Sequence, residues 1–374
     1  MKSLKIATIS VFILILLTGC KETINIEDIT MGLIFGIDTN NPQQKKLQIF
    51  MSSPVFSEEA KEKNEQIMVD ASSIREARTL FDSKVNGVTT AGKLQALLVG
   101  TKLTEQKNWT SILDFLYREP KLRQNADLVF FDGNVSELLK LKEEDKPRLS
   151  IFIPQLIETA DFRNVTLRTS LRMFHQMSYE KGITPYLPKM SIKDEELEVS
   201  GIVLLDKNFF VKQTLSIEET QLFSLLQGKL KGQLGIMASI KEVRDKNQLF
   251  NIQRASYSIR KIKRKVDCNF NHNQFDFEIS YKIPVTVSQS PIKLNNKTVG
   301  RLRKEIESTL EKDLNGLVHK FQANEVDPLG LGILASSYQH EHWKKVKSNW
   351  PKDFKNSKIH VKAKIIIVDK GLTM

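Results

Sequence analysis

The sequence contains one long apolar run, and that run lies near its N-terminus. Residues 6–17 are all apolar or small, and Lys2 and Lys5 precede them. A helix needs about 20 apolar residues to cross about 30 Å of hydrocarbon, so this run fits a signal peptide and is too short for a membrane span. No later segment approaches that length. We therefore expect the rest of the chain to fold as a body outside the bilayer.

The apolar run ends at Leu17-Thr18-Gly19-Cys20. This tetrapeptide resembles the lipobox of bacterial lipoproteins, in which the cysteine receives a diacylglycerol and the signal peptide is cut just before it. The alternative is an ordinary signal peptide or a short anchor helix that happens to contain a cysteine. Only two cysteines occur in the chain, and one stands where lipidation requires it. We predict a signal peptide over residues 1–19 and lipidation of Cys20.

The composition excludes several classes of protein. With 40% hydrophobic and 27% charged residues, the chain is neither disordered nor a multi-spanning membrane protein. The net charge of +12 favours acidic neighbours, but the basic residues are spread along the sequence without a nucleic-acid-binding motif. Two cysteines, Cys20 and Cys268, exclude a disulfide scaffold and a zinc site built on cysteine pairs. Cys268 is expected to be a small buried residue.

Helix and strand signals alternate along the chain, which predicts a mixed α/β (α+β) fold. Ser73-Glu76 and Ser216-Glu219 have the spacing of capping boxes and should begin helices. Apolar residues three and four positions apart predict a long amphipathic helix over about 299–321, and a shorter helix over 111–117. The expected strands are 31–38, 47–51, 94–99, 127–131, 201–205, 209–211, 255–266, 275–287 and 359–368.

These elements suggest three domains behind the signal peptide. We assign residues 20–195 to an N-terminal α/β domain and 196–254 to a small middle βα domain. Residues 255–374 form the expected C-terminal α+β domain, which contains the long helix. The body is thus expected to consist of small sheets packed against helices.

The sequence offers no catalytic constellation. His340 and His342 would point about 200° apart on a helix, so we expect exposed polar residues and no metal site. Residues 327–332 are glycine-rich but lack the Lys-Ser/Thr of a phosphate loop, and they predict a helix stop followed by a tight turn. No nucleophile-elbow or zinc-protease motif occurs, and the carboxylates lack a spacing typical of acid and base pairs. We expect no enzymatic activity, no cofactor and no metal.

One basic segment remains open to two interpretations. Residues 260–265 place five basic side chains in six positions of a β-type segment. We favour an edge strand kept soluble by charge, and the alternative is contact with anionic lipid headgroups. Nucleic acid is disfavoured for an exported chain. A looser cluster, Arg163, Arg168 and Arg172, has the same ambiguity.

Several distinctive segments follow one another along the chain. Near the C-terminus they are Phe321-Gln322, Asp327-Pro328-Leu329-Gly330-Leu331-Gly332, Trp343, Trp350, Phe354 and the strand over 359–368. Earlier pieces are 201–207 with 216–220, and 114–120, which contains Arg118, followed by Arg123. This ordered set covers nearly the whole chain and resembles the Ger(x)C family, the lipoprotein C subunits of spore nutrient germinant receptors. The family usually has Trp after the lipidated cysteine, where Lys21 stands here.

The resemblance implies a three-domain body in a complex with two other subunits. One partner is an integral membrane protein with a large soluble domain, and the other resembles an amino-acid transporter. It also implies a location on the outer face of the spore inner membrane and no catalytic residues. A free-standing exported lipoprotein that binds a ligand at the cell envelope is the alternative, and an envelope hydrolase ranks third.

The family segments yield candidates for structural or partner-binding roles. Arg118 and Arg123 could anchor a partner, although a surface salt bridge is the favoured interpretation of either one alone. Seven positions separate Trp343 and Trp350, so on one helix they would share a face that Phe354 extends. That face could bind a partner, but we favour packing against the long helix. Pro351 indicates a kink or a new helix there.

If Cys20 is lipidated, replacing this cysteine should remove the membrane anchor. Two or three acyl chains at about 0.8 kcal/mol per buried CH₂ hold a protein on a membrane durably. Cys20→Ala should release the protein or leave its precursor uncut, which membrane fractionation and the intact mass measure. A variant that stays membrane-bound and normally processed would contradict the lipobox interpretation.

Overall fold

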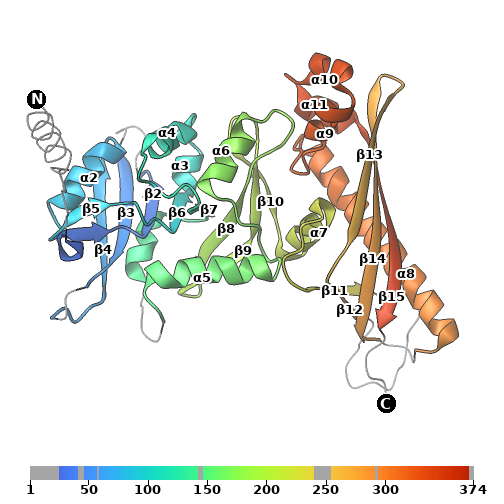
Figure 1. The fold of residues 1–374 in the computed structure, drawn as a ribbon, viewed down its shortest axis with the longest axis horizontal. Coiled ribbons are helices and arrows are strands. Elements are labelled where there is room, and N and C mark those ends of the chain that lie inside the picture. The colour runs from blue at the N-terminus through green and yellow to red at the C-terminus, as the bar shows by residue number, and fades with distance from the viewer. Residues whose placement is uncertain are drawn as a thin grey trace, which may run out of the picture.

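The computed structural model describes residues 25–40, 46–56, 59–141, 146–239, 254–290 and 294–369. The predicted signal peptide and Cys20 lie outside these residues. Figure 1 shows an elongated molecule in which one large sheet occupies the N-terminal half and a second the C-terminal half. Helices pack against both sheets, which confirms the predicted α+β class.

The first sheet has eight strands in the order β10-β9-β8-β7-β6-β2-β3-β4. Its central strands β2, β6, β7 and β8 pair in parallel, and antiparallel strands complete both ends. Every residue of β6 and β7 is buried, as expected for parallel strands covered on two faces. The strands are β2 (Ile34–Asp38), β3 (Leu47–Pro54), β4 (Asn64–Ala71), β6 (Ala96–Gly100), β7 (Asp127–Phe131), β8 (Tyr186–Lys193), β9 (Glu196–Leu205) and β10 (Val211–Leu215).

Helices cover both faces of this sheet. One face packs against α2 (Ile74–Asp82), α4 (Ile112–Arg118) and α6 (Leu171–Tyr179), and the other against α5 (Leu149–Phe162). The Ser73 hydroxyl accepts from Glu76 N as predicted. The Glu76 carboxylate, however, accepts from Ser72 N and not from Ser73, so only half of the expected capping box forms. The short elements are α3 (Thr101–Thr104), the two-stranded sheet β1 (Ile29–Met31) with β5 (Val88–Thr90), and 3-10 helices Ile26–Asp28, Trp109–Ser111 and Val135–Lys140.

Strands of the predicted middle domain are shared between the two sheets. β9 and β10 complete the first sheet, whereas β11 (Leu234–Ser239) belongs to the second. Between them lies α7 (Ile217–Gln227), which begins with the complete capping box predicted at Ser216 and Glu219. Strand pairing therefore crosses the expected boundary at 195/196. The division into three domains stays a prediction.

The second sheet contains β11, β12 (Arg254–Ile259), β13 (Lys263–Asn271), β14 (Gln274–Gln289) and β15 (Lys358–Asp369). β15 pairs in parallel with one edge of β14, so β12 and β13 must follow one another along its other edge. The single strand predicted over 255–266 is therefore wrong. Ile259 pairs with Val285 of β14, and Lys263 pairs with Lys282. Between these pairs the chain advances four positions and β14 only three, so one extra residue interrupts the pairing.

The predicted long helix is α8 (Asn296–Ala323), and its apolar side packs in the core with the second sheet. Three short helices follow: α9 (Leu331–Tyr338), α10 (His340–Val346) and α11 (Trp350–Asn356). Figure 1 shows them at one end of the second sheet, beside the tip of β13.

Only part of the basic segment lies on a strand. Lys263 and Lys265 belong to β13, with which the described residues pair no strand beyond β14, so the edge-strand interpretation holds for them. Residues 260–262 form the interruption. In the register of three strands, Lys263 is opposite Lys282, and Lys282 is opposite Lys364. Like charges placed opposite one another are unfavourable, so this row is a basic surface that folding alone does not explain. Contact with anionic lipid stays a prediction.

Side chains of α8 cover the free edge of β15. Asn315 donates from Nδ2 to Val361 O (2.9 Å) and accepts from Val361 N at Oδ1 (3.0 Å), which reproduces the two hydrogen bonds of a neighbouring strand. Glu311 Oε1 accepts from Ala363 N (2.8 Å). The long helix thereby fixes the last strand and protects an edge that could otherwise pair with another chain.

Asn315→Ala should lower the free energy of unfolding by about 2 kcal/mol, because it leaves two backbone groups of Val361 unpaired. Chemical denaturation of the purified protein measures this. Lys312→Ala is the control, since Lys312 is exposed on the same helix, and its effect should stay within about 0.5 kcal/mol. Equal effects of the two substitutions would contradict the edge-covering role.

Candidate functional site

The glycine-rich segment at 327–332 joins the two halves of the molecule. Thr184, in the loop before β8, donates from N to Asp327 O (2.8 Å), and Asp327 N donates to Thr184 Oγ1 (2.7 Å). Gly332 lies against Gly182 of the same loop so closely that an added Cβ would stand 2.5 Å from Gly182 Cα. Gly330 has φ +69° and precedes α9, so the expected helix stop and turn occur here.

The Asp327 carboxylate organises this junction from inside. Its Oδ2 accepts from Gly332 N (2.9 Å) and from Trp350 Nε1 (2.9 Å), and the residue is 1% exposed. One carboxylate therefore holds the start of α9 against the start of α11. Burial raises the pKa of Asp327 to about 6, although the hydrogen bonds from Gly332 and Trp350 oppose the rise.

The predicted aromatic residues are part of the core. Trp343, Trp350 and Phe354 are all buried, and the Trp350 ring lies 5.0 Å from Trp343 and 5.4 Å from Phe275 of β14 between centroids. Their burial in one core with α8 is the arrangement expected for packing. The single shared helical face is wrong, because Trp343 lies on α10 and Trp350 begins α11. Pro351 occupies the first turn of α11, which favours a new helix there.

The two candidate arginines make ordinary surface contacts. Arg118 Nε lies 2.8 Å from Asp114 Oδ2 one turn earlier on α4, and both side chains are largely exposed. Arg123 donates from Nη1 to Gln95 Oε1 (3.0 Å). An exposed ion pair of this kind contributes at most about 1 kcal/mol. A partner-binding role for either residue stays a prediction.

The remaining residues considered in the sequence analysis lie in separate parts of the molecule. His340 is exposed, whereas the half-buried His342 ring stacks on Phe270 with centroids 3.8 Å apart. Cys268 is buried as expected, and burial raises the pKa of its thiol to about 11. Arg168 forms a two-pronged pair with the buried Asp127 at 2.8 and 3.0 Å. Over the described ranges, no group of His, Cys, Asp or Glu residues could hold a metal ion, and no helix is long and apolar enough to cross a membrane.

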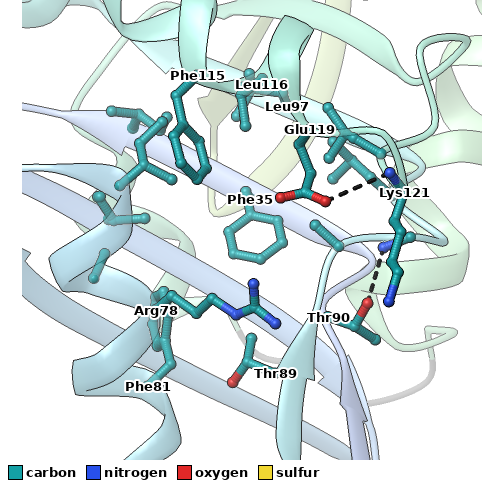
Figure 2. A pocket seen from close by; sticks show the side chains of 18 residues that line it. Phe35, Arg78, Phe81, Thr89, Thr90, Leu97, Phe115, Leu116, Glu119 and Lys121 are labelled. Atoms are coloured by element: carbon teal, nitrogen blue, oxygen red, sulfur yellow. Dashed lines mark hydrogen bonds between the residues drawn. The ribbon is translucent and has the colours of Figure 1, made fainter. Parts of the chain in front are cut away.

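A cavity of about 190 Å³ lies beside α4, and sequence reasoning missed it. Figure 2 shows Phe35 of the sheet in the middle of the cavity, with Leu97 of the sheet and Phe115 and Leu116 of α4 above it and Phe81 of α2 below. The loop between β5 and β6 completes the wall. Because these side chains come from segments distant in the sequence, no local sequence pattern predicts the cavity. Phe115 is 36% exposed at the cavity, although the sequence places it on the apolar face of its helix.

Comparison with known protein families accounts for both halves of the chain. Residues 22–192 match the family described as spore germination protein N-terminal domain, and residues 200–371 match spore germination B3/GerAC-like, C-terminal. The chain belongs to the Ger(x)C family of spore germination proteins. The resemblance inferred from the sequence is thereby confirmed.

Individual relatives of the Ger(x)C family align over almost their whole length. Spore germination protein B3 of Bacillus subtilis (strain 168) is 25% identical over 385 residues, which cover 98% of each chain. Spore germination protein GerQC of Bacillus cereus is 22% identical over 369 residues, 96% of this chain and 97% of the relative. The crystal structure of the GerBC protein has the same fold, with a TM-score of 0.58 and 18% identity over 90% of this chain and 97% of that one.

The junction explains several residues of the Ger(x)C signature in this chain. Asp327 and Trp350 share a hydrogen bond, and Gly332 leaves room for both Gly182 and the Trp350 ring, whose Nε1 would be 2.6 Å from an added Cβ. Gln322 donates from Nε2 to Phe354 O (3.0 Å) and to Ser357 O (2.7 Å), which fixes the end of α11. These C-terminal signature residues thus help to build the joint between the two halves of the molecule.

The buried Asp327 predicts a pH dependence of stability. Its pKa is about 6 in the folded protein and near 3.8 when exposed, so between these values the folded state holds a proton that the unfolded state has released. Asp327 therefore contributes up to about 3 kcal/mol to the free energy of unfolding below pH 4, and this contribution is lost as the pH rises through 6.

Asp327→Asn keeps an oxygen that can accept from Gly332 and Trp350 but removes the titration. The free energy of unfolding of the natural protein, relative to this variant, should therefore fall between pH 4 and 7. Urea unfolding across that range measures the difference, in which other titrating groups cancel. Parallel pH profiles for the two proteins would contradict the assignment to Asp327.

Proposed function

We propose that this chain is a lipid-anchored subunit of a spore germinant receptor and contributes to germination by assembly, without chemistry of its own. The observation that carries the proposal is the match of both halves of the chain, in order, to two spore germination families over residues 22–192 and 200–371. Relatives named spore germination proteins that align along their full length support the same role.

A lipid at Cys20 would give this body its place of action. The anchor confines the protein to a thin layer at the membrane, which raises its effective concentration against membrane-embedded partners. Modest interfaces then suffice for assembly. We place the protein on the outer face of the spore inner membrane, in a complex with an integral membrane subunit that has a large soluble domain and with a transporter-like subunit.

The arrangement of the distinctive residues supports assembly over catalysis. Asp327, Trp350 and Gly332 would be candidates for chemistry if they lined a cleft, but here they bind one another inside the junction. The alternative function, a free-standing ligand-binding lipoprotein, is favoured by one observation, the cavity beside α4.

Isolation from spores tests the proposal. Tagged full-length protein, purified gently from spore membranes, should bring down the two membrane subunits, which mass spectrometry identifies. The Cys20→Ala protein is the matched control, because it retains the folded body and loses the anchor. Recovery of the natural protein alone would contradict membership of a receptor and favour the free-standing alternative.

Deletion of the gene gives an independent readout. Spores without the protein should lose or slow their response to particular nutrients, and they should still germinate by a route that bypasses receptors. Intact responses to every nutrient, in a strain without redundant receptors, would contradict the proposal. So would turnover of a substrate by the purified protein.

A further inference from the structure

The cavity beside α4 opens to solvent and is lined mainly by apolar side chains. Its walls come from α2, the β5–β6 loop, the end of α4 and the face of the first sheet. Phe35, Leu97 and Leu116 line its inner part, and Phe115 forms the outer wall. A dry cavity of about 150 Å³ is large enough to hold benzene, so a cavity of about 190 Å³ admits a ring or a branched chain with a small polar group attached.

One side of the cavity carries a positive charge that has no partner. Arg78 lines the cavity from α2, and Figure 2 shows its guanidinium extending toward Thr89 below the Phe35 ring. The other arginines near this site, Arg118 and Arg123, are occupied by Asp114 and Gln95. The Arg78 side chain, in contrast, is exposed at the edge of the cavity and forms no ion pair or hydrogen bond with any residue that the structure describes. Its five donors are therefore available to a ligand.

Thr89 lies at the same end of the cavity, but its hydroxyl does not belong to the site. The residue is 4% exposed, and its Oγ1 is buried with no hydrogen-bond partner among the described residues. Figure 2 shows this hydroxyl on the side of Thr89 that faces away from the Arg78 guanidinium. Arg78 is therefore the group that would hold the polar end of a ligand.

The charge around the opening also favours an anion. Arg78 and Lys121 contribute two positive charges to the lining, and Glu119 contributes one negative charge. The Glu119 carboxylate accepts a hydrogen bond at Oε1 from Lys121 N (3.5 Å). Asp82 accepts from Thr89 N (2.8 Å) but does not line the cavity. Arginine binds carboxylates through two parallel hydrogen bonds, which gives both affinity and orientation.

We propose that this cavity is a binding site for a small apolar monocarboxylate, with the carboxylate at Arg78 and the apolar part between Phe35, Leu97 and Phe115. This site is independent of the proposed function, because it rests on the lining of one cavity and needs no partner subunit. An amine of the same shape is disfavoured because it would place its charge against Arg78.

The test uses the full-length protein in phosphatidylcholine vesicles, since detergent tails could enter the cavity. Three probes share one apolar part: 3-phenylpropanoate, 3-phenylpropanamide and 3-phenylpropylamine. Ligand-observed NMR, corrected with protein-free vesicles, measures the affinity of each. The carboxylate should bind at least about tenfold more tightly than the amide, because an ionised partner strengthens the hydrogen bonds of Arg78. The amine should bind most weakly.

Matched variants locate the site. Arg78→Met keeps the length and packing of the side chain and should weaken carboxylate binding by about tenfold or more. Arg75→Met, one turn earlier on α2 and outside the cavity lining, is the control and should bind like the natural protein. Thr89→Val is a second control and should leave both binding and stability unchanged, because the hydroxyl it removes has no partner and faces away from Arg78.

A cavity-filling variant distinguishes this site from other apolar surfaces. Ala91 is half-buried in the loop that lines the cavity, so Ala91→Leu should abolish binding of 3-phenylpropanoate while the thermal unfolding temperature stays within about 2 °C. Binding that survives Ala91→Leu or Arg78→Met would overturn the proposal. Equal affinities for the carboxylate and the amide would overturn it too, and so would the absence of binding by all three probes, which would leave the cavity to a side chain of a partner protein.

Discussion

The structure depends on one buried carboxylate. The buried Asp327 carboxylate accepts hydrogen bonds from Gly332 N and Trp350 Nε1. The backbone of Asp327 forms two more hydrogen bonds with Thr184, which lies in the other half of the molecule. A buried charge is costly unless such partners surround it, so every element that provides one is fixed in place. The pKa of Asp327 is raised because these hydrogen bonds offset only part of the free energy needed to bury the charge.

The hydrophobic core carries the same connection over a larger area. Residues of the first sheet such as Tyr186 and Ile202 share one core with α7, α8 and the second sheet, and Phe223 of α7 contacts both Tyr186 and Phe321 edge to face. The aromatic rings around Trp350 continue this core toward the tip of β13. The two halves of the molecule are thus joined by one continuous hydrophobic core.

The C-terminal residues that mark the Ger(x)C family and the residues that could bind a ligand lie in different places. The first set builds the joint at 327–332 and the ends of α9 and α11. The second set lines a cavity in the N-terminal half, where the Arg78 side chain has no partner inside the protein and where Phe115 and Leu116 come from the family segment at 114–120. The fold of the first half provides that cavity because α2 and α4 cover one face of the sheet and leave space between them.

The sequence by itself determined the elements whose signals are local. The capping box at Ser216, the apolar stripe of α8 and the buried runs of β6 and β7 each depend on residues a few positions apart, and each forms as predicted. Family membership also followed from short segments in a fixed order. Only the tertiary structure decided how β9, β10 and β11 are shared between two sheets, why Asp327 needs Trp350, and where a cavity remains. Those outcomes depend on contacts between distant segments, such as β7 with β8 and Asp327 with Trp350, and no local pattern records which distant partner a strand edge, a carboxylate or an apolar face will find.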